Sequence, residues 1–264
     1  MTVRMHGSRP EQDVQVSDHG DGVVVVAFGQ DPHMTVLTEA LLVKIAGTLE
    51  ETQQDAHCCV VAGGSRHFAV GSDLRELRLV GPLDYLTSRR RDAWERIHAL
   101  TVPLVAAVAG FALGGACELA LACDLVVASD TARFGQPEPR LGIMPGAGGT
   151  QRWTRVVGRH VATDVILGGR VVDAWEAKRL GIASRVVPRE RLLACAVETA
   201  RTVASNGPLS ARLSKQAIAA ADEVGLRSGL DYERLLFSSL LSTSDRTEGI
   251  TAFLEKRPPR YEGR

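Results

Sequence analysis

The sequence has few cysteines, and their arrangement excludes a common type of metal or redox site. The chain of 264 residues has five, and the count is odd. No two of them show the C-x-x-C spacing of a zinc or disulfide-exchange site. They lie in apolar stretches, which is typical of reduced core residues in a cytosolic protein. We therefore expect a cytoplasmic protein with no disulfides. The five are Cys58, Cys59, Cys117, Cys123 and Cys195.

The chain also has no excess of charge and no long apolar run. Its 31 basic and 31 acidic residues give a net charge of zero, which argues against nonspecific binding to nucleic acid. A small anionic ligand is still possible, because it needs only a few local cations. The longest apolar stretch, residues 102–116, is broken by Pro103, Gly110, Gly114 and Gly115 and is too short to span a bilayer. The N-terminus lacks the apolar segment of a signal peptide, so we expect no membrane association.

Apolar periodicity predicts strands that alternate with helices. We expect strands at 14–16, 23–28, 58–61, 104–108 and 124–128, and helices at 38–52, 82–100 and 116–122. This alternation indicates an α/β fold with mostly parallel strands. From Ala174 to Leu254 nearly everything reads as helix, apart from a short strand near residues 184–187. Some apolar faces of this tail are candidates for packing against a partner subunit.

Two glycine-containing turns are candidates for stabilising negative charge. Gly114 and Gly115 lead into the helix predicted at 116–122, and the first amides of a helix are unpaired and lie at its positive end. The amide of Gly115 is therefore a candidate oxyanion donor, and the Gly71-Ser72 turn is a candidate for the second. Each such donor contributes about 3 kcal/mol to transition-state stabilisation. Taken alone, the Gly114-Gly115 pair is equally consistent with a tight packing point.

Two glutamates follow these turns and suggest proton transfer. Glu118 has apolar neighbours, so burial should raise its pKa and let it hold or release a proton near neutral pH. Glu138 follows Pro137 in a loop, and two carboxyl groups in one pocket would favour sharing a proton. Each is also consistent with an ordinary role, Glu118 as a partly exposed helix residue and Glu138 as an N-cap or surface residue. The run from Gly146 to Gly149 is no dinucleotide loop, because Gln151 stands where that motif needs glycine.

Three segments, taken in order, resemble the enoyl-CoA hydratase/isomerase (crotonase) family. They are Phe68-Ala-Val-Gly-Ser-Asp-Leu74, Ala109-Gly-Phe-Ala-Leu-Gly-Gly-Ala-Cys-Glu-Leu119, and Phe134-Gly-Gln-Pro-Glu138 continuing to Gly149-Thr-Gln-Arg152. The stretches 169–174 and 252–258 also match, so the resemblance covers residues 13–264. It implies an α/β spiral of ββα units over residues 13–200. It also implies a helical region at 201–264 that builds a homotrimer, often doubled to a hexamer. Residues 1–12, which the resemblance does not cover, read as a flexible N-terminal arm.

The resemblance also implies a reaction and a set of site residues. The expected reaction is the reversible syn addition of water to a trans-2-enoyl-CoA, with Glu118 and Glu138 as catalytic residues and the amides of Ser72 and Gly115 as the oxyanion hole. The family needs no metal and no redox cofactor, and coenzyme A is part of the substrate. We favour Glu118 as the base for water and Glu138 as the proton donor, although the two can share both tasks. The residues expected to contact the substrate or its CoA moiety are Ala69, Val70, Gly71, Asp73, Leu74, Arg75, Gly114, Pro137, Gly146, Gly149, Phe253 and Lys256.

Several positions depart from the family pattern or are ambiguous. Residues 29–37 replace the usual N-terminal segment near CoA, Val70 replaces a smaller residue near the adenine, and Ser72 replaces a common alanine. Arg75 matches a position that is often basic, and Lys256 matches a lysine that reaches the CoA of a neighbouring subunit. Each of these two is equally consistent with a solvated surface charge. The walls of the acyl pocket should come from segments 75–95 and 140–160 and from the C-terminal helices.

Other functions compete with hydration. A Δ3,Δ2-enoyl-CoA isomerase would keep the fold and move the double bond without adding water. A noncatalytic acyl-CoA-binding protein would bind without turnover, but having both Glu118 and Glu138 argues against it. A serine hydrolase would need a His–Asp pair beside Ser72, and no such motif is apparent.

Overall fold

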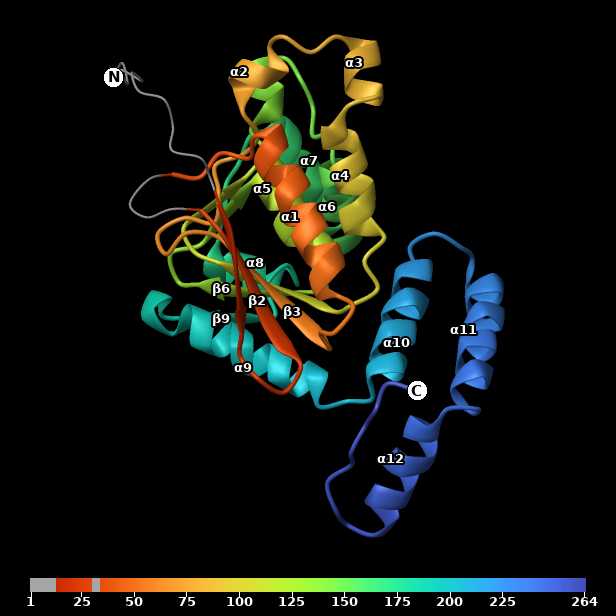
Figure 1. The fold of residues 1–264 in the computed structure, drawn as a ribbon. Helices are drawn as coiled ribbons and strands as arrows, with labels where there is room; N and C mark the ends of the chain where they lie inside the picture. The colour runs from red at the N-terminus through yellow and green to blue at the C-terminus, as the bar shows by residue number, and fades with distance from the viewer. Residues whose placement is uncertain (1–12, 30–33) are drawn as a thin grey trace.

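A six-stranded sheet forms the centre of the molecule, in a computed structural model that describes residues 13–29 and 34–264 (Figure 1). The expected arm at 1–12 and residues 30–33 of the atypical segment lie outside this described part. The sheet has the order β1-β2-β3-β4-β6-β9, and only β1 is antiparallel to its neighbour. Its strands are β1 (Val14–Asp18), β2 (Val23–Phe28), β3 (Cys58–Ala62), β4 (Leu104–Val108), β6 (Leu125–Ser129) and β9 (Arg185–Val187).

A second, three-stranded sheet forms from short strands that follow the main ones. It has the order β5-β7-β8, with β5 (Phe111–Leu113) parallel to β7 (Arg133–Gly135) and β7 antiparallel to β8 (Val172–Asp173). Thus β4-β5-α5 and β6-β7-α6 each place one strand in each sheet and then a helix, as in a ββα unit. The helices are α5 (Gly115–Ala122) and α6 (Gly149–Val157). A bridge between Ala69 and Ala112 extends the second sheet towards the segment after β3.

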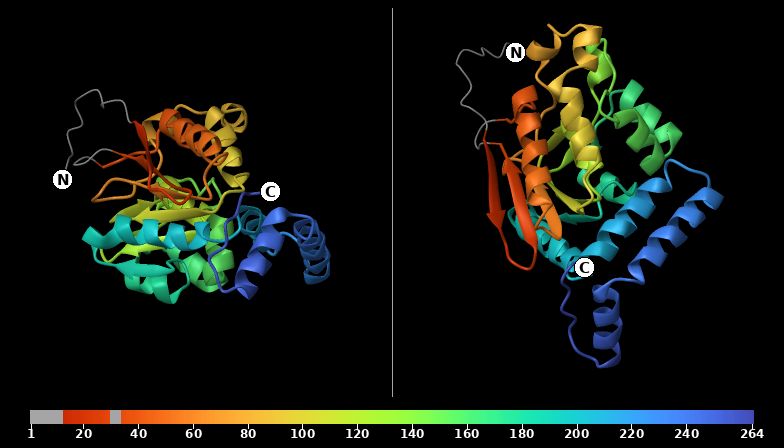
Figure 2. Two further views of the ribbon diagram at one scale, coloured as in Figure 1. Left: turned by 60° about the horizontal axis from the view of Figure 1, so that its bottom comes forward. Right: turned by 45° about the vertical axis from the view of Figure 1, so that its right-hand side comes forward.

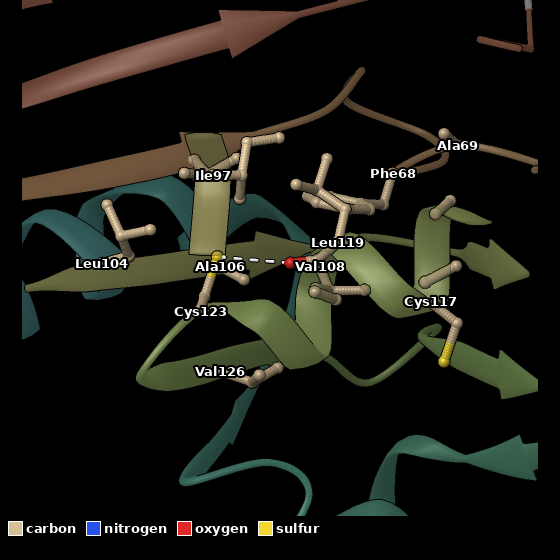
Figure 3. Packing of buried hydrophobic residues seen from close by; sticks show 14 of the residues in the cluster. Phe68, Ala69, Ile97, Leu104, Ala106, Val108, Cys117, Leu119, Cys123 and Val126 are labelled. Carbon is tan, nitrogen blue, oxygen red and sulfur yellow. Dashed lines mark hydrogen bonds between the residues drawn. The ribbon is translucent and has the colours of Figure 1, made fainter. Parts of the chain in front are cut away.

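Alternate side chains of the central strands enter two separate apolar cores. On one face, Val61, Ala106 and Val108 pack with residues of α1 (Glu39–Thr52), α4 (Arg89–His98), α5, α6 and α7 (Arg159–Leu167). Figure 3 shows part of this core, where Cys123 Sγ contacts the carbonyl oxygen of Leu119 at 3.5 Å. On the other face, Val60 and Val105 pack against α9 (Leu192–Ala204). This two-sided burial explains why the parallel strands are almost wholly apolar.

The local sequence explains where the predicted elements differ from the observed ones. The helix expected at 82–100 is two helices, α3 (Pro82–Leu86) and α4, because the Ser88 side chain accepts a hydrogen bond from Arg91 N and caps a new helix. Strands β5 and β7 were not predicted, since each has three residues beside glycines. The elements that complete this part are α2 (Leu74–Leu77), the 3₁₀ helices η1 (Glu138–Leu141) and η2 (Arg189–Arg191), and α8 (Ala174–Arg179).

Three C-terminal helices extend away from the two cores. They are α10 (Pro208–Ala220), α11 (Leu226–Leu240) and α12 (Ser244–Leu254), and Figure 2 shows them projecting to one side. No residue of α11 is buried, although Leu226, Leu235 and Phe237 are large and apolar. The expected boundary at residue 200 falls inside α9, which packs on the central sheet, and the chain leaves that sheet at residues 205–207. Among the described residues, no helix has the length and apolarity needed to cross a membrane.

Candidate active site

One cavity of about 960 Å³ collects most of the residues expected at the site. It lies beside the N-terminus of α5 and is bordered by α2, α3, α4 and the segment from η1 to Ala147. Four expected substrate contacts do not line it, namely Ala69, Gly149, Phe253 and Lys256. The expected residues that do line it are Val70, Gly71, Ser72, Asp73, Leu74, Arg75, Gly114, Gly115, Glu118, Pro137, Glu138 and Gly146.

The candidate oxyanion donors lie next to each other. Gly115 is the first residue of α5, and a Cβ atom built on it would lie 3.7 Å from Ser72 N and 2.7 Å from Ser72 Oγ. Gly114 precedes it with φ 54° and ψ −130°, a conformation that an L side chain rarely adopts. The Ser72 segment is held by a bridge to Leu37 and by a hydrogen bond of 2.8 Å from Leu37 N to Gly71 O. Both amide-bearing turns are thus fixed by backbone contacts on the edge of the cavity.

Ala69 belongs to this scaffold rather than to the cavity wall. It is completely buried, its N–H donates to Phe111 O at 3.0 Å, and its carbonyl accepts from Leu113 N at 3.4 Å. Its pairing with the second sheet therefore positions the Gly71-Ser72 turn at the edge of the cavity.

Glu118 is a buried carboxylate held by two backbone amides. Only 3% of the residue is exposed, and its Oε1 atom accepts hydrogen bonds from Ala147 N at 2.7 Å and Gly149 N at 2.8 Å. Burial raises its pKa, while the two amides and the positive charge of Arg152 oppose that rise. Gly149, expected to contact substrate, does not line the cavity and donates its N–H to Glu118. The sequence signal for this contact was the glycine-rich run 146–149, whose amides are free to turn inward.

Glu138 reaches the same cavity from the opposite side of the glycine pair. A Cβ atom on Gly114 would lie 2.8 Å from Glu138 Oε1, and one on Gly115 would lie 3.9 Å from Glu118 Oε2. Burial raises the pKa of Glu138 to about 7, and the neighbouring Glu118 carboxylate adds to the effect. The buried Gln136 amide, turned so that its nitrogen faces Glu138, donates to both carboxyl oxygens at 3.1 and 3.0 Å. The site therefore pairs one carboxyl group anchored by amides with another that titrates near neutral pH.

The rest of the cavity wall is mostly apolar and comes largely from two of the expected segments, 75–95 and 140–160. Among the described residues, none from the C-terminal helices, the third expected source, lines it. Tyr85 connects the two segments, since its hydroxyl donates to Gly146 O at 3.1 Å. These side chains could not be assigned individually from the sequence, because nothing in their spacing distinguishes a pocket wall from a core face. The large wall residues outside the motifs are Leu77, Tyr85, Leu86, Trp94, Leu141, Ile143 and Met144.

Of the expected charged contacts, Asp73 and Arg75 line the cavity, whereas Lys256 lies outside it. Asp73 lines the cavity, but its carboxylate caps α2 by accepting from Arg75 N at 2.8 Å. Phe253 is 83% exposed at the end of α12, and Lys256 follows it in a turn with φ 56°. Figure 1 shows α12 at the opposite end of the molecule from α2 and α3. Neither residue can reach the cavity of its own chain.

The geometry agrees with comparisons to known proteins. The family model for enoyl-CoA hydratase/isomerase matches residues 18–264. The chain belongs to the enoyl-CoA hydratase/isomerase family. The 2,3-dehydroadipyl-CoA hydratase of Escherichia coli is 43% identical over 244 residues, which cover 92% of this chain and 96% of that protein. The mitochondrial enoyl-CoA hydratase of Pongo abelii is 36% identical, over 91% of this chain and 83% of that protein.

Solved structures of the family show the same architecture. An enoyl-CoA hydratase from Bacillus anthracis has a TM-score of 0.89 at 36% identity and covers 96% of this chain and 100% of that one. A Geobacillus kaustophilus enoyl-CoA hydratase subunit has a TM-score of 0.90 at 37% identity, with 95% and 98% covered. The predicted crotonase fold, in which ββα units precede C-terminal helices, is therefore confirmed.

Proposed function

We propose that this chain is an enoyl-CoA hydratase that adds water to a trans-2-enoyl-CoA and yields a 3-hydroxyacyl-CoA. One observation carries the proposal. Glu118 and Glu138 open into a single cavity, on either side of the turn that presents the Gly115 amide next to that of Ser72. Two carboxyl groups and two amide donors suffice for hydration of an activated double bond.

The proposed mechanism gives each group one task. The thioester oxygen accepts hydrogen bonds from the amides of Ser72 and Gly115, which withdraws electron density and makes the β-carbon electrophilic. Glu118 removes a proton from water as the water oxygen bonds to the β-carbon. The electron pair of the double bond moves to the α-carbon through the enolate, and Glu138 protonates it there. Transfer of one proton from Glu118 to Glu138 then restores the starting state.

These groups supply the whole reaction, so we propose that no metal or redox cofactor takes part. Water is activated by a carboxylate and the enolate charge is neutralised by amide donors, without any change of oxidation state at the enzyme. The five cysteines are unpaired, and burial raises the pKa of Cys58, Cys59 and Cys117 to about 12, which keeps these thiols protonated. Because all five thiols are free, we propose a reducing, cytoplasmic location.

A direct assay separates this function from its rivals. The enoyl absorbance of crotonyl-CoA falls when water adds, whereas an isomerase or a noncatalytic binding protein leaves it unchanged. A serine hydrolase would release free CoA thiol instead, but no histidine lines the cavity in the part of the chain that the structure describes. A panel of enoyl-CoA substrates of increasing chain length, including one with a terminal carboxylate, would define the acyl group.

The hydration activity should decline in alkaline solution, because Glu138 loses its proton there. Glu138 must carry a proton to protonate the α-carbon, and with a pKa of about 7 it is protonated below that pH and ionised above it. We therefore expect kcat/KM for crotonyl-CoA to fall as the pH rises through about 7. A profile that stays level from pH 6 to pH 9 would contradict the assignment of Glu138 as the proton donor.

We further propose that α10, α11 and α12 assemble the chain into a homotrimer or a hexamer. In the single chain no residue of α11 is fully buried, and exposed apolar residues occur from Leu226 to Leu254. Many large apolar residues left exposed on neighbouring helices are typical of a subunit interface. A partner's α12 could then bring Phe253 and Lys256 to the CoA site, where Lys256 would contact phosphate.

Replacing Phe253 and Leu254 with aspartate should therefore dissociate the oligomer. Their side chains are 83% and 74% exposed in the single chain, so the change should disrupt association without opening either core. Sedimentation velocity should show a monomer, while the control Thr247→Asp, at an exposed polar position of the same helix, keeps the wild-type species. A wild-type sedimentation coefficient in the double variant would contradict the proposed interface.

A further inference from the structure

Arg152 occupies an unusual place behind the Glu118 carboxylate. It lies in the first turn of α6, where the helix dipole is unfavourable for a cation. Its guanidinium turns back on the preceding loop, where Nη1 donates to Ala147 O at 3.2 Å. The backbone at Gly148 has φ 102°, which favours glycine, and a Cβ atom there would lie 1.9 Å from that nitrogen. The guanidinium thus occupies the space that the missing side chain of Gly148 leaves open.

The loop that Arg152 contacts is also the one that holds Glu118. Ala147 donates its N–H to Glu118 Oε1 and accepts from Arg152 through its carbonyl, so one residue links the two charged groups. Gly149 N is the second donor to the same oxygen, and it belongs to the helix that carries Arg152. Two amides, a helix N-terminus and a cation therefore converge on one carboxylate.

Glu138 has no comparable support. The interactions that alter its ionisation are its burial, a backbone hydrogen bond and the repulsion of Glu118, and no cation is among them. Its side-chain partner, Gln136, is neutral. Two carboxyl groups that share a cavity will place a shared proton on the one whose charge is less stabilised. The two sides of the site are electrostatically unequal for this reason.

We propose that Arg152 is a positioning residue that keeps Glu118 ionised, so that the shared proton resides on Glu138. This inference rests on the proposed hydratase function. It adds the residue that determines which glutamate is ionised and acts as base, and which is protonated and acts as acid. Arg152 acts by fixing the backbone of Ala147 and through its charge, and it does not line the cavity.

Other charged groups near this pair do not act on Glu118 in the same way. Arg75 and Arg90 also line the cavity, but Arg90 pairs with Glu76, and neither is among the charges that alter the ionisation of Glu118 or Glu138. Glu118 is approached by Glu138 from η1, Tyr85 from α3 and Cys117 from its own helix, all of which are neutral or negative. Around Arg152 lie His98 from α4, Cys123 after α5, Asp222 after α10 and Arg155 one turn along α6. Burial and the neighbouring Arg152 lower the pKa of His98 to about 4, so it stays neutral when the enzyme works. Arg152 is the cation that acts on Glu118 among the described residues.

The test is the pH profile of Arg152→Gln against Arg152→Lys and the control Arg155→Gln. Without the cation, Glu118 takes up a proton at higher pH, and the acidic limb of kcat/KM for crotonyl-CoA should move up. We expect the ratio of activity at pH 6 to that at pH 8 to fall at least about tenfold in Arg152→Gln. Arg152→Lys restores the wild-type ratio by keeping the charge. Arg155 is exposed and contacts Gln151 and Asp222, so its variant keeps the wild-type profile.

A readout without turnover separates this inference from the proposed function. Infrared difference spectra identify the protonated carboxyl band of Glu118 as the one missing in Glu118→Gln. In Arg152→Gln this band should appear at higher pH than in the wild type, even if the protein hydrates no substrate. The inference is overturned if the band titrates unchanged, or if Gln and Lys variants lose activity equally at every pH. If Arg152→Gln does not fold, a lysine variant with a wild-type band supports the inference, and a shifted band overturns it.

Discussion

Glu138→Gln should lower kcat for crotonyl-CoA hydration at least about a hundredfold, the usual scale for loss of a general acid or base. The amide has the shape of the carboxylic acid but cannot deliver a proton to the α-carbon. Because Glu138 meets the cavity beside Gly114 and does not hold the oxyanion donors, binding of a saturated analogue such as butyryl-CoA should be unchanged. Loss of enoyl absorbance and calorimetric titration measure the two quantities.

The matched control is Glu190→Gln. Glu190 is an exposed glutamate in η2, and it does not line the cavity. It should match the wild type in both measurements. Turnover near the wild-type rate in Glu138→Gln would remove this residue from the mechanism. Equal losses of turnover and of butyryl-CoA binding would instead mean that Glu138 shapes the pocket.

Gly115→Ala should reduce kcat at least about a hundredfold, comparable to the loss of one oxyanion donor. The backbone at Gly115 is helical and tolerates alanine, but the new methyl group would lie 3.7 Å from Ser72 N, in the space between the two amide donors. The thioester oxygen could then no longer reach both. Steady-state kinetics with crotonyl-CoA, together with the thermal midpoint, would show a catalytic loss larger than any loss of stability.

Two further variants locate the cause. The new methyl group also lies 2.7 Å from Ser72 Oγ, so adding Ser72→Ala should relieve that clash and recover stability without recovering activity. Gly225→Ala introduces the same methyl group where nothing lies within 4 Å and should leave both properties unchanged. Recovered turnover in the Gly115→Ala/Ser72→Ala variant would show that the hydroxyl, and not the amide geometry, was responsible.

Much of the architecture could be predicted, because buried strands and helices have characteristic patterns of apolar residues in the sequence. Strands such as 23–28 and 104–108 match the observed β2 and β4, since apolar side chains fill both faces of a parallel sheet. The strands β5 and β7 have only three residues each, which is too few for such a pattern to be recognised. They exist because the neighbouring main strands bring Phe111 and Arg133 into register, which is a tertiary effect.

The site shows the same division between local and tertiary information. Glu118 and the Gly114-Gly115 turn are adjacent in sequence, so their association with a helix N-terminus could be deduced directly. The anchoring of Glu118 by Ala147 and Gly149 could not, because it depends on how α6 packs beside α5. Likewise, Phe253 and Lys256 matched family positions, yet a single chain places them away from its own cavity.

The way the Ser72 turn is held makes it a place where local unfolding should abolish activity. It is held by a few backbone hydrogen bonds to residues distant in sequence, from Leu37 N to Gly71 O, from Val70 N to Thr35 O and from Leu113 N to Ala69 O. Local opening of such a segment takes less free energy than global unfolding. Mild denaturant should therefore extinguish catalysis while the helical circular dichroism signal persists. Hydration activity would then serve as an early indicator of damage to the native state, ahead of any spectroscopic sign of unfolding.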